Sequence, residues 1–210
     1  MTGVFITLEG VEGVGKSTNL TYIQSKLNAS GHPVVVTREP GGTEMAEEIR
    51  HLLLQPRSEP VSEMAELLLM FAARAQHLHA LIKPSLNAGQ WVLCDRFTDA
   101  TFAYQGGGRG LPLHWISNLE TMVQQTIKPD LTFLLDLPVE IGLERAAKRS
   151  ELDRFEVEKK TFFEQVRNAY LMRAEQEPDR FAIIDASVSL SEVHAQIDKV
   201  LAEKLGVKAE

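Results

Sequence analysis

The sequence predicts an α/β fold in which a five-stranded parallel sheet carries helices on both faces. Five short runs of apolar and β-branched residues recur along the chain, and longer segments with helical periodicity separate them. Strands that alternate with helices favour right-handed crossovers, which make the strands parallel and bury them on both faces. Polar residues that follow these runs are the first candidates for a site, because ligands of such sheets bind at the carboxyl ends of the strands.

The elements follow in order from the same alternation. Each expected strand is a short buried run, beginning with VFITL before a Gly-rich loop, and the strands span 4–8, 34–37, 91–94, 131–135 and 181–184. The expected helices lie between the strands and after the last one, at 16–29, 43–54, 62–88, 113–126, 140–149, 158–175 and 190–205. The segment QGGGRGLP at 105–112 is expected to be a loop inside the domain, because glycine and proline interrupt both patterns.

The composition narrows the class of protein. The chain has 210 residues, 44% of them hydrophobic, which suits a single domain spanning 1–210 with its own core. A net charge of −7 disfavours nucleic acid as a partner, because binding to polyanions depends on Lys and Arg. Cys94 is the only cysteine and lies in the apolar run WVLC, so we expect a buried thiol and a reducing compartment. No apolar run approaches the roughly 20 residues that span a bilayer, and no basic signal segment precedes the first strand, so we expect a cytoplasmic protein without a membrane segment.

A phosphate-binding loop follows the first predicted strand. Gly10, Gly15, Lys16 and Ser17 fill the pattern G-x-x-x-x-G-K-[ST] between a strand and a helix start. The glycines allow backbone N–H groups to face phosphate oxygens, and the helix adds its positive N-terminal dipole. Lys16 can reach the β- and γ-phosphates of a nucleoside triphosphate, and the Ser17 hydroxyl can ligate Mg²⁺. The alternative is a Gly-rich turn that opens a helix by chance.

Two further strand ends carry charged residues. Asp95 follows the third predicted strand, where a carboxylate can hold a Mg²⁺-bound water, and Arg96 can grip a phosphate with two hydrogen bonds. Arg38 follows the second strand in TREPGGT, where it can hold a second phosphate, and Pro40 offers a rigid surface for a base. The alternatives are an ion pair between Asp95 and Arg96, and a tight turn with a solvated Arg38.

The predicted helix at 62–88 places an arginine on an apolar face. Phe71 lies three residues before Arg74, so the two side chains share that face. A guanidinium among apolar groups needs hydrogen bonds, and beside an aromatic ring it can receive a planar base with an exposed carbonyl. An internal partner, Glu39 or Glu66, is the alternative. The helix is apolar nearly all round, which indicates full burial or a subunit interface.

Two more segments carry candidate binding residues. Thr101, Tyr104 and Gln105 recur at spacings of three and four, so they form a polar, uncharged helix face that suits a neutral base and sugar, unless that face meets water. The basic segment at 142–156 carries Arg149 and Arg154, and arginines on a segment that closes over a nucleotide can neutralise the transferring group. A solvated helix with internal acidic partners is the alternative for that segment.

The motifs GVEGVGKST, TREPGGT, LLMFAARAQH, CDRFTDATFAYQGGGRG and RSELDRFE resemble, in order and spacing, those of bacterial thymidylate kinases. The resemblance implies a P-loop kinase fold with a short lid at about 142–156, ATP and Mg²⁺ as cofactors, and conversion of dTMP to dTDP. It also implies a homodimer formed through the helix around Glu66 to Leu86. Another P-loop nucleoside or nucleotide kinase is the main alternative activity, and a nucleotide-dependent switch is the non-enzymatic one.

The same resemblance assigns roles to single residues. The expected ATP and Mg²⁺ contacts are Gly10, Gly13, Gly15, Lys16, Ser17, Thr18 and Asp95. The expected dTMP contacts are Arg38 and Arg96 at the phosphate, Phe71 stacked on thymine, Arg74 and Gln105 at the base, and Thr101 and Tyr104 as the rest of the pocket. Gly13 stands where one branch of the family carries a catalytic arginine, so that role is expected for a lid residue, Arg149 or Arg154. Glu12 is expected to orient the 3′-hydroxyl.

Overall fold

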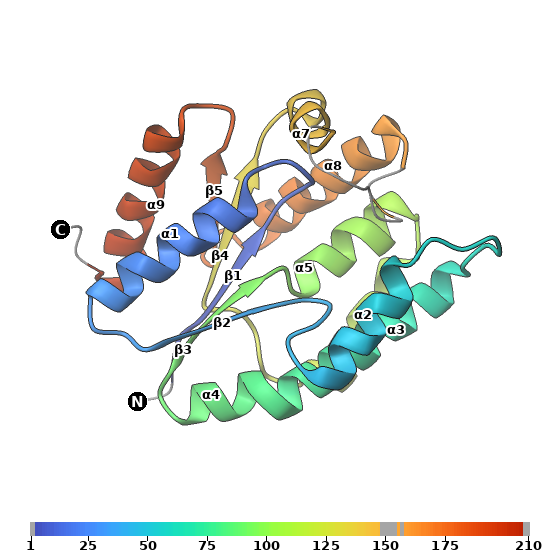
Figure 1. Ribbon diagram of the computed structural model, residues 1–210, viewed down its shortest axis with the longest axis horizontal. Coiled ribbons are helices and arrows are strands. Elements are labelled where there is room, and N and C mark those ends of the chain that lie inside the picture. The colour runs from blue at the N-terminus through green and yellow to red at the C-terminus, as the bar shows by residue number, and fades with distance from the viewer. Residues whose placement is uncertain (1–2, 148–154, 156–157, 208–210) are drawn as a thin grey trace.

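The five predicted strands form one parallel sheet (Figure 1). The computed structural model describes residues 3–147, 155 and 158–207. The strand order is β2-β3-β1-β4-β5, with bounds β1 (Phe5–Glu9), β2 (Val34–Arg38), β3 (Trp91–Asp95), β4 (Leu131–Asp136) and β5 (Phe181–Asp185). Leu8 and Arg38 both lie opposite Asp95, so the carboxyl ends of β1, β2 and β3 meet at one edge of the sheet.

Helices cover both faces of the sheet, as predicted (Figure 1). On one face, α1 (Lys16–Ala29) contacts β1 and β3, and α9 (Leu190–Leu205) contacts β5. On the other, α4 (Lys83–Asn87) contacts β3, and α8 (Lys160–Gln176) contacts β4 and β5. The remaining helices are α2 (Glu44–Leu54), α3 (Glu63–His77), α5 (Thr98–Thr101), α6 (Leu113–Gln124) and α7 (Val139–Ala146). The predicted helix at 140–149 is described only as far as residue 147, so its end cannot be compared.

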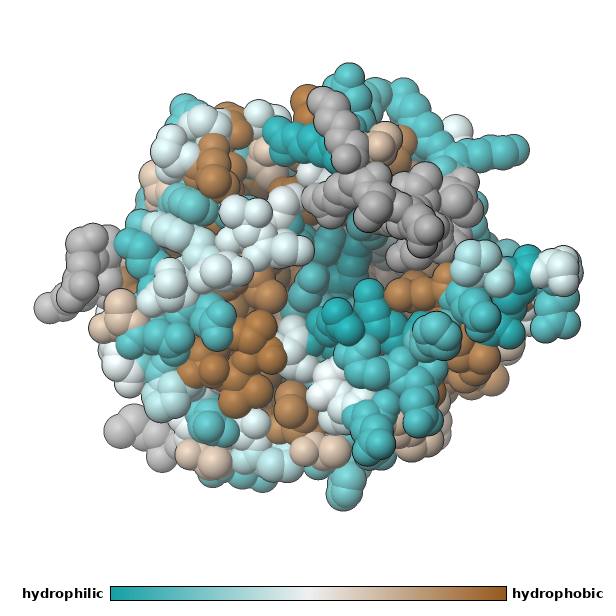
Figure 2. Space-filling model, viewed as in Figure 1, coloured by the Kyte–Doolittle hydropathy of each residue, from teal (hydrophilic) through white to brown (hydrophobic). Residues whose placement is uncertain are grey.

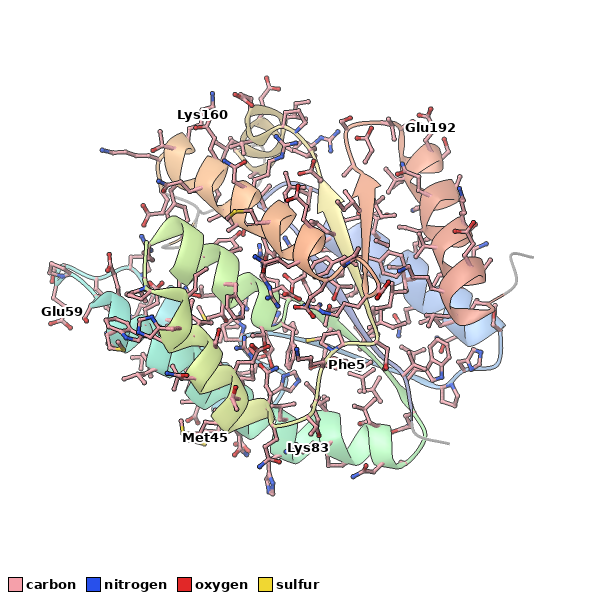
Figure 3. The ribbon with its side chains drawn as sticks, turned by 180° about the vertical axis from the view of Figure 1, so that it is seen from behind. Phe5, Met45, Glu59, Lys83, Lys160 and Glu192 are labelled. Atoms are coloured by element: carbon pink, nitrogen blue, oxygen red, sulfur yellow. The ribbon has the colours of Figure 1, made fainter. Side chains whose placement is uncertain are left out.

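The core lies between the sheet and these helices. Figure 3 labels Phe5 in the middle of the molecule, where its ring packs edge-on against Phe97 at 4.9 Å between centroids. The strand interiors are apolar on both faces, which explains why they read as continuous hydrophobic runs. At the end of the chain, Ser189 and Glu192 form a capping box that starts α9, and Gly206 ends it in a left-handed conformation.

The long predicted helix is continuous in path but not uniform. Between α3 and α4 the backbone widens into one π-helical stretch, η1 (Leu78–Ile82). Pro84 follows directly, and a proline cannot donate the i→i−4 hydrogen bond and displaces the carbonyl it would have met. A wider turn before the proline accommodates that loss.

The prediction of a loop at 105–112 was wrong for its first half. Helical turns continue from α5 through a second π-helical stretch, η2 (Phe102–Gly108), and the loop begins only after it. The glycines serve close packing there: a Cβ on Gly107 would lie 2.6 Å from the Ala169 side chain, and one on Gly108 would lie 2.4 Å from the Phe162 ring. Both contacts come from α8, so η2 lies against that helix more closely than larger residues would allow.

Within the described ranges, no helix combines the length and the apolar composition that a membrane crossing requires.

Candidate active site

A polar cleft opens at the sheet edge where β1, β2 and β3 end. In the view of Figure 1, Figure 2 shows it as a recessed hydrophilic area near the centre of the molecule. The loop after β1 forms one wall, the segments after β2 and β3 form the floor, and α3 and η2 form the opposite wall. The predicted site residues that line it are Glu12, Gly13, Gly15, Lys16, Ser17, Pro40, Arg74, Asp95, Arg96, Thr101, Tyr104 and Gln105.

The phosphate-binding loop has the geometry that its sequence predicts. Gly15 has φ 90° and directly precedes α1, so the first N–H groups of that helix open toward the loop. Lys16 Nζ folds over the loop and donates to the carbonyls of Gly10 and Val11 at 3.2 and 3.1 Å. Burial lowers the pKa of Lys16 and Arg96 lowers it further, whereas Glu12 and Asp95 act in the opposite direction. A half-buried cation beside open N–H groups is a site for an anion.

Gly13 has a steric reason to be glycine. Its φ is 74°, and a Cβ there would lie 1.9 Å from the carbonyl oxygen of Gly142 in α7. A side chain at this position would separate the loop from α7, because the clash is with backbone. The prediction that no P-loop arginine serves this chain is consistent with this packing. The lid residues Arg149 and Arg154, predicted to take that role, lie outside the described residues.

Asp95 and Arg96 do not form the strand-capping ion pair that was one alternative. Arg96 instead pairs with Glu12 at 2.5 Å and donates to the carbonyl of Gly10 and the hydroxyl of Tyr170 at 3.0 and 3.1 Å. Burial opposes the charge of Arg96, but Tyr104 and Glu12 outweigh it and raise the pKa of the guanidinium. Arg96 is therefore a fixed cation on the cleft floor.

One oxygen of Asp95 is available to a ligand. Its Oδ1 atom is buried and has no hydrogen-bond partner among the described residues, and Asp95 lines the cleft together with Ser17. Buried carboxylate oxygens are normally satisfied, so an open one implies a missing partner. A carboxylate and a hydroxyl are the oxygen donors that Mg²⁺ uses beside phosphates, so these two residues fit that ion.

Arg74 is held internally, as the alternative reading proposed, and still faces the cleft. It is 2% exposed, and its Nε donates to Glu39 at 2.7 Å while its Nη2 donates to Thr101 at 2.9 Å. His77 donates to the other oxygen of Glu39 at 3.0 Å, because a carboxylate can only accept. The Arg74 Nη1 atom is buried without a partner among the described residues, and Arg74 lines the cleft. Arg74 can therefore offer N–H groups to a ligand without leaving Glu39.

The polar face of η2 also contributes to the cleft. Tyr104 donates its hydroxyl hydrogen to Glu12 at 3.1 Å, and burial raises the pKa of Tyr104 well above its ordinary value. Gln105 donates to the carboxylate of Glu66 at 2.8 Å. Phe155, from the predicted lid segment, lies edge-on to Tyr104 with ring centroids 6.0 Å apart, and it lines the cleft.

Phe71 lies outside the cleft lining, so its stacking on a base stays a prediction. It is 2% exposed and packs beneath the guanidinium of Arg74, whose Cζ lies 4.8 Å from the ring centroid. Met70 lines the cleft instead, one residue earlier on α3. Residues four apart on a helix lie on one face, and Met70 stands four before Arg74, so the spacing could have identified it.

The predicted phosphate ligand Arg38 also lies outside the cleft lining. Its side chain is 53% exposed and forms a salt bridge with Glu47 at 2.8 Å. Arg50 of α2, which the sequence reasoning missed, lines the cleft and donates to the carbonyl of Pro40 at 2.9 Å. The signal that could have found it is an arginine four residues after the buried Ala46. Gly10 and Thr18 are the other predicted residues outside the lining, although Gly10 accepts from Lys16 and Arg96.

Comparison with known proteins identifies relatives along nearly the whole chain. A family model described as thymidylate kinase matches residues 8–197. The thymidylate kinase of Pseudomonas syringae pv. tomato is 60% identical over 205 residues, which cover 98% of both chains. That of Ectopseudomonas mendocina is 59% identical and covers 96% of both chains. Among solved structures, the thymidylate kinase of Ehrlichia chaffeensis has a TM-score of 0.77 and 32% identity, covering 96% of this chain and 99% of that one.

Proposed function

The chain belongs to the thymidylate kinase family, and we propose that its cleft transfers the γ-phosphoryl group of ATP to the phosphate of dTMP, which yields dTDP and ADP. The observation that supports this most is the coexistence, in one cleft, of a phosphate-binding loop and a separate set of cations at Arg50, Arg74 and Arg96. A simple nucleotide hydrolase or a switch has no need of a second anion site. An acceptor that is itself a phosphate requires one.

Positioning and charge neutralisation dominate the proposed mechanism. The acceptor oxygen is already ionised, so the transfer needs no strong general base. Lys16 neutralises charge on the donor phosphates, while Arg96 and Arg50 reduce the repulsion between two polyanions. Glu12 holds Arg96 and Tyr104 and is placed to orient the sugar of the acceptor. Ser17 and Asp95 would hold Mg²⁺, which when bound would supply neutralisation of the charge that develops on the phosphates.

The base of the acceptor lies, in this proposal, between α3 and η2. Arg74 and Gln105 bring hydrogen-bond donors, and Met70 and Pro40 bring apolar surface suited to the faces of thymine. We assign the stacking surface to Met70, because Phe71 is covered by Arg74. The location we propose is the cytoplasm, where a reducing environment suits the buried thiol of Cys94.

An acceptor series tests this function. Purified protein with ATP and Mg²⁺ receives dTMP, dUMP, dCMP, dAMP or dGMP in turn, and ADP release is followed. We expect turnover with dTMP and less with dUMP, which lacks the methyl group that Met70 and Pro40 would contact. We expect little with dCMP and dAMP, because Arg74 has no acceptor for their amino groups, and little with dGMP, whose base is larger. Equal turnover with several of these acceptors would favour a different nucleotide kinase.

The geometry predicts that Arg50, and not Arg38, holds the acceptor phosphate together with Arg96. Arg50→Ala is expected to raise the KM for dTMP by about 10- to 100-fold, the value of one hydrogen-bonded charge contact. Arg38→Ala removes only an exposed ion pair and is expected to change that KM less than about threefold. Steady-state kinetics with varied dTMP at saturating ATP measures both. A larger increase of that KM in Arg38→Ala than in Arg50→Ala would show that Arg38 holds the phosphate instead.

A homodimer through α3 is a further prediction. Exposed apolar side chains gather on α2, α3 and α6, which pack together: Met45, Leu52, Leu68, Leu113, Trp115 and Met122. Such a surface is typical of a subunit interface. Wild-type protein is expected to elute at about twice the chain mass, and Leu68→Asp as a monomer, since a buried unpaired charge opposes association. Met172→Asp, on an equally exposed position of α8, is the control and should leave the dimer intact.

A further inference from the structure

Glu9 is a buried carboxylate that contacts residues of the site without lining the cleft. It ends β1, immediately before the phosphate-binding loop, and is 0% exposed. Burying a carboxylate is costly unless hydrogen bonds compensate, so the groups that hydrogen-bond to Glu9 indicate its role. Glu9 accepts one hydrogen bond from the backbone N–H of Phe97 at 2.7 Å and one from the hydroxyl of Tyr170 at 2.8 Å.

The two contacts lead to Arg96 by different routes. Arg96 Nη1 lies 3.1 Å from the Tyr170 hydroxyl oxygen, and a guanidinium can only donate. Tyr170 therefore accepts from Arg96 and gives its own hydrogen to Glu9. The two hydrogen bonds therefore run in one direction, from Arg96 to Tyr170 and from Tyr170 to Glu9.

The second route runs through the backbone. Arg96 has φ 68°, a left-handed conformation that is unfavourable for a residue other than glycine. Such a conformation persists only where the surroundings hold it. The bond from Phe97 N–H to Glu9 fixes the peptide that follows Arg96. Glu9 thus holds both the backbone and the side-chain end of Arg96.

We propose that Glu9 is a positioning residue, which acts through Tyr170 and the Phe97 peptide to aim Arg96 at the acceptor phosphate. This inference rests on the proposed function, since it takes Arg96 to be a phosphate ligand. Glu9 itself touches neither substrate. Its replacement should therefore weaken recognition of the phosphate and leave recognition of the base intact.

The charge state of Glu9 provides a separate readout. Burial and, less strongly, Asp99 raise the pKa of Glu9 to about 8, against the opposing effects of Arg96 and of the hydrogen bonds from Tyr170 and Phe97. The charged or titratable groups that face it from neighbouring elements are Lys16, Cys94, Arg96, Asp99 and Tyr170. The ionised carboxylate accepts from Tyr170 and Phe97 more strongly than a protonated one, because a hydrogen bond to a charged acceptor is shorter and stronger than one to a neutral acceptor. Phosphate recognition is therefore expected to strengthen as pH rises through about 8.

The test compares equilibrium binding of dTMP and thymidine, which differ only in the phosphate, by calorimetry without ATP at pH 8.5. Glu9→Gln and Tyr170→Phe are each expected to weaken the binding of dTMP about 10- to 100-fold, and to leave the affinity for thymidine within about twofold of the wild-type value. The double variant should be little worse than either single variant, because both act through one chain of contacts. Between pH 7 and 9, the wild type should gain dTMP affinity and Glu9→Gln should not.

Two matched controls separate positioning from general damage. Asp130→Asn removes a carboxylate that accepts from Phe5 N–H at 2.7 Å, at the opposite end of β1. Tyr22→Phe removes a hydroxyl bonded to Asp198 at 2.8 Å, on α1. Both should bind dTMP as the wild type does. The inference would be overturned if either Glu9→Gln or Tyr170→Phe bound dTMP as tightly as the wild type. It would also be overturned if both variants lost affinity for thymidine as much as for dTMP. A wild type that does not distinguish dTMP from thymidine would instead overturn the assignment of Arg96 and with it the proposed function.

Discussion

Lys16→Ala is expected to lower kcat by about two to three orders of magnitude, the effect of removing one group that stabilises charge in a transition state. Lys16 is a half-buried cation that folds over the phosphate-binding loop and lines the cleft. Alanine removes the ammonium group that folds over the loop, so Lys16 no longer neutralises charge on the donor phosphates. Single-turnover and steady-state rates of dTDP formation measure the loss.

Lys26→Ala is the matched control for this prediction. Lys26 stands on the same helix, α1, but pairs with Asp198 at 3.3 Å away from the cleft. Its loss should leave kcat within about twofold, since a surface ion pair of this kind contributes little. If Lys16→Ala kept more than a tenth of the wild-type kcat, the lysine would not have the role assigned to it.

Arg74→Met is expected to cost about 3–5 kcal/mol of unfolding free energy, because it leaves the Glu39 carboxylate buried beside an uncharged side chain. Glu39 is 5% exposed and receives the Arg74 Nε hydrogen at 2.7 Å. The variant should also lose discrimination between dTMP and dCMP. A guanidinium donates to the 4-carbonyl of thymine but has no acceptor for the 4-amino group of cytosine.

The double variant Glu39→Gln, Arg74→Met separates the two effects. Neutralising Glu39 should restore part of the unfolding free energy, measured by urea denaturation, because no unpaired charge remains buried. It should not restore the preference for dTMP. Recovery of that preference in the double variant would show that Arg74 contributes stability alone.

Features set by local sequence could be predicted with near-complete success. Strands β1, β3 and β4 read as apolar runs because the parallel sheet buries them on both faces, and helices α1 and α9 were placed by the helical pattern that follows a strand. The loop at Lys16 was recognisable because strand, glycines and helix start are adjacent in the chain. Gly106 to Gly108 misled the prediction, since glycine marks both turns and close packing, and only the approach of α8 decides between them.

Features set by tertiary contacts were not accessible in the same way. The partner of Arg74 was left open because Glu39 lies 35 residues away in the chain, and only the sheet edge brings them together. Phe71 and Met70 are neighbours on α3, and helical spacing admits either to the face of Arg74. Tertiary packing determines which of the two lines the cleft: the Phe71 ring lies under the guanidinium of Arg74, and Met70 lines the cleft. The role of Glu9 required knowing that α8 delivers Tyr170.

The most direct test of the central claim is the product balance of the wild-type reaction. Protein, ATP and Mg²⁺ are incubated with either dTMP or thymidine, and ADP and the thymidine nucleotides are quantified by chromatography. We expect one dTDP for each ADP with dTMP, and neither product with thymidine, because the second anion site must be filled before transfer. ADP formed at the same rate without dTMP, or in excess over dTDP, would contradict the central claim.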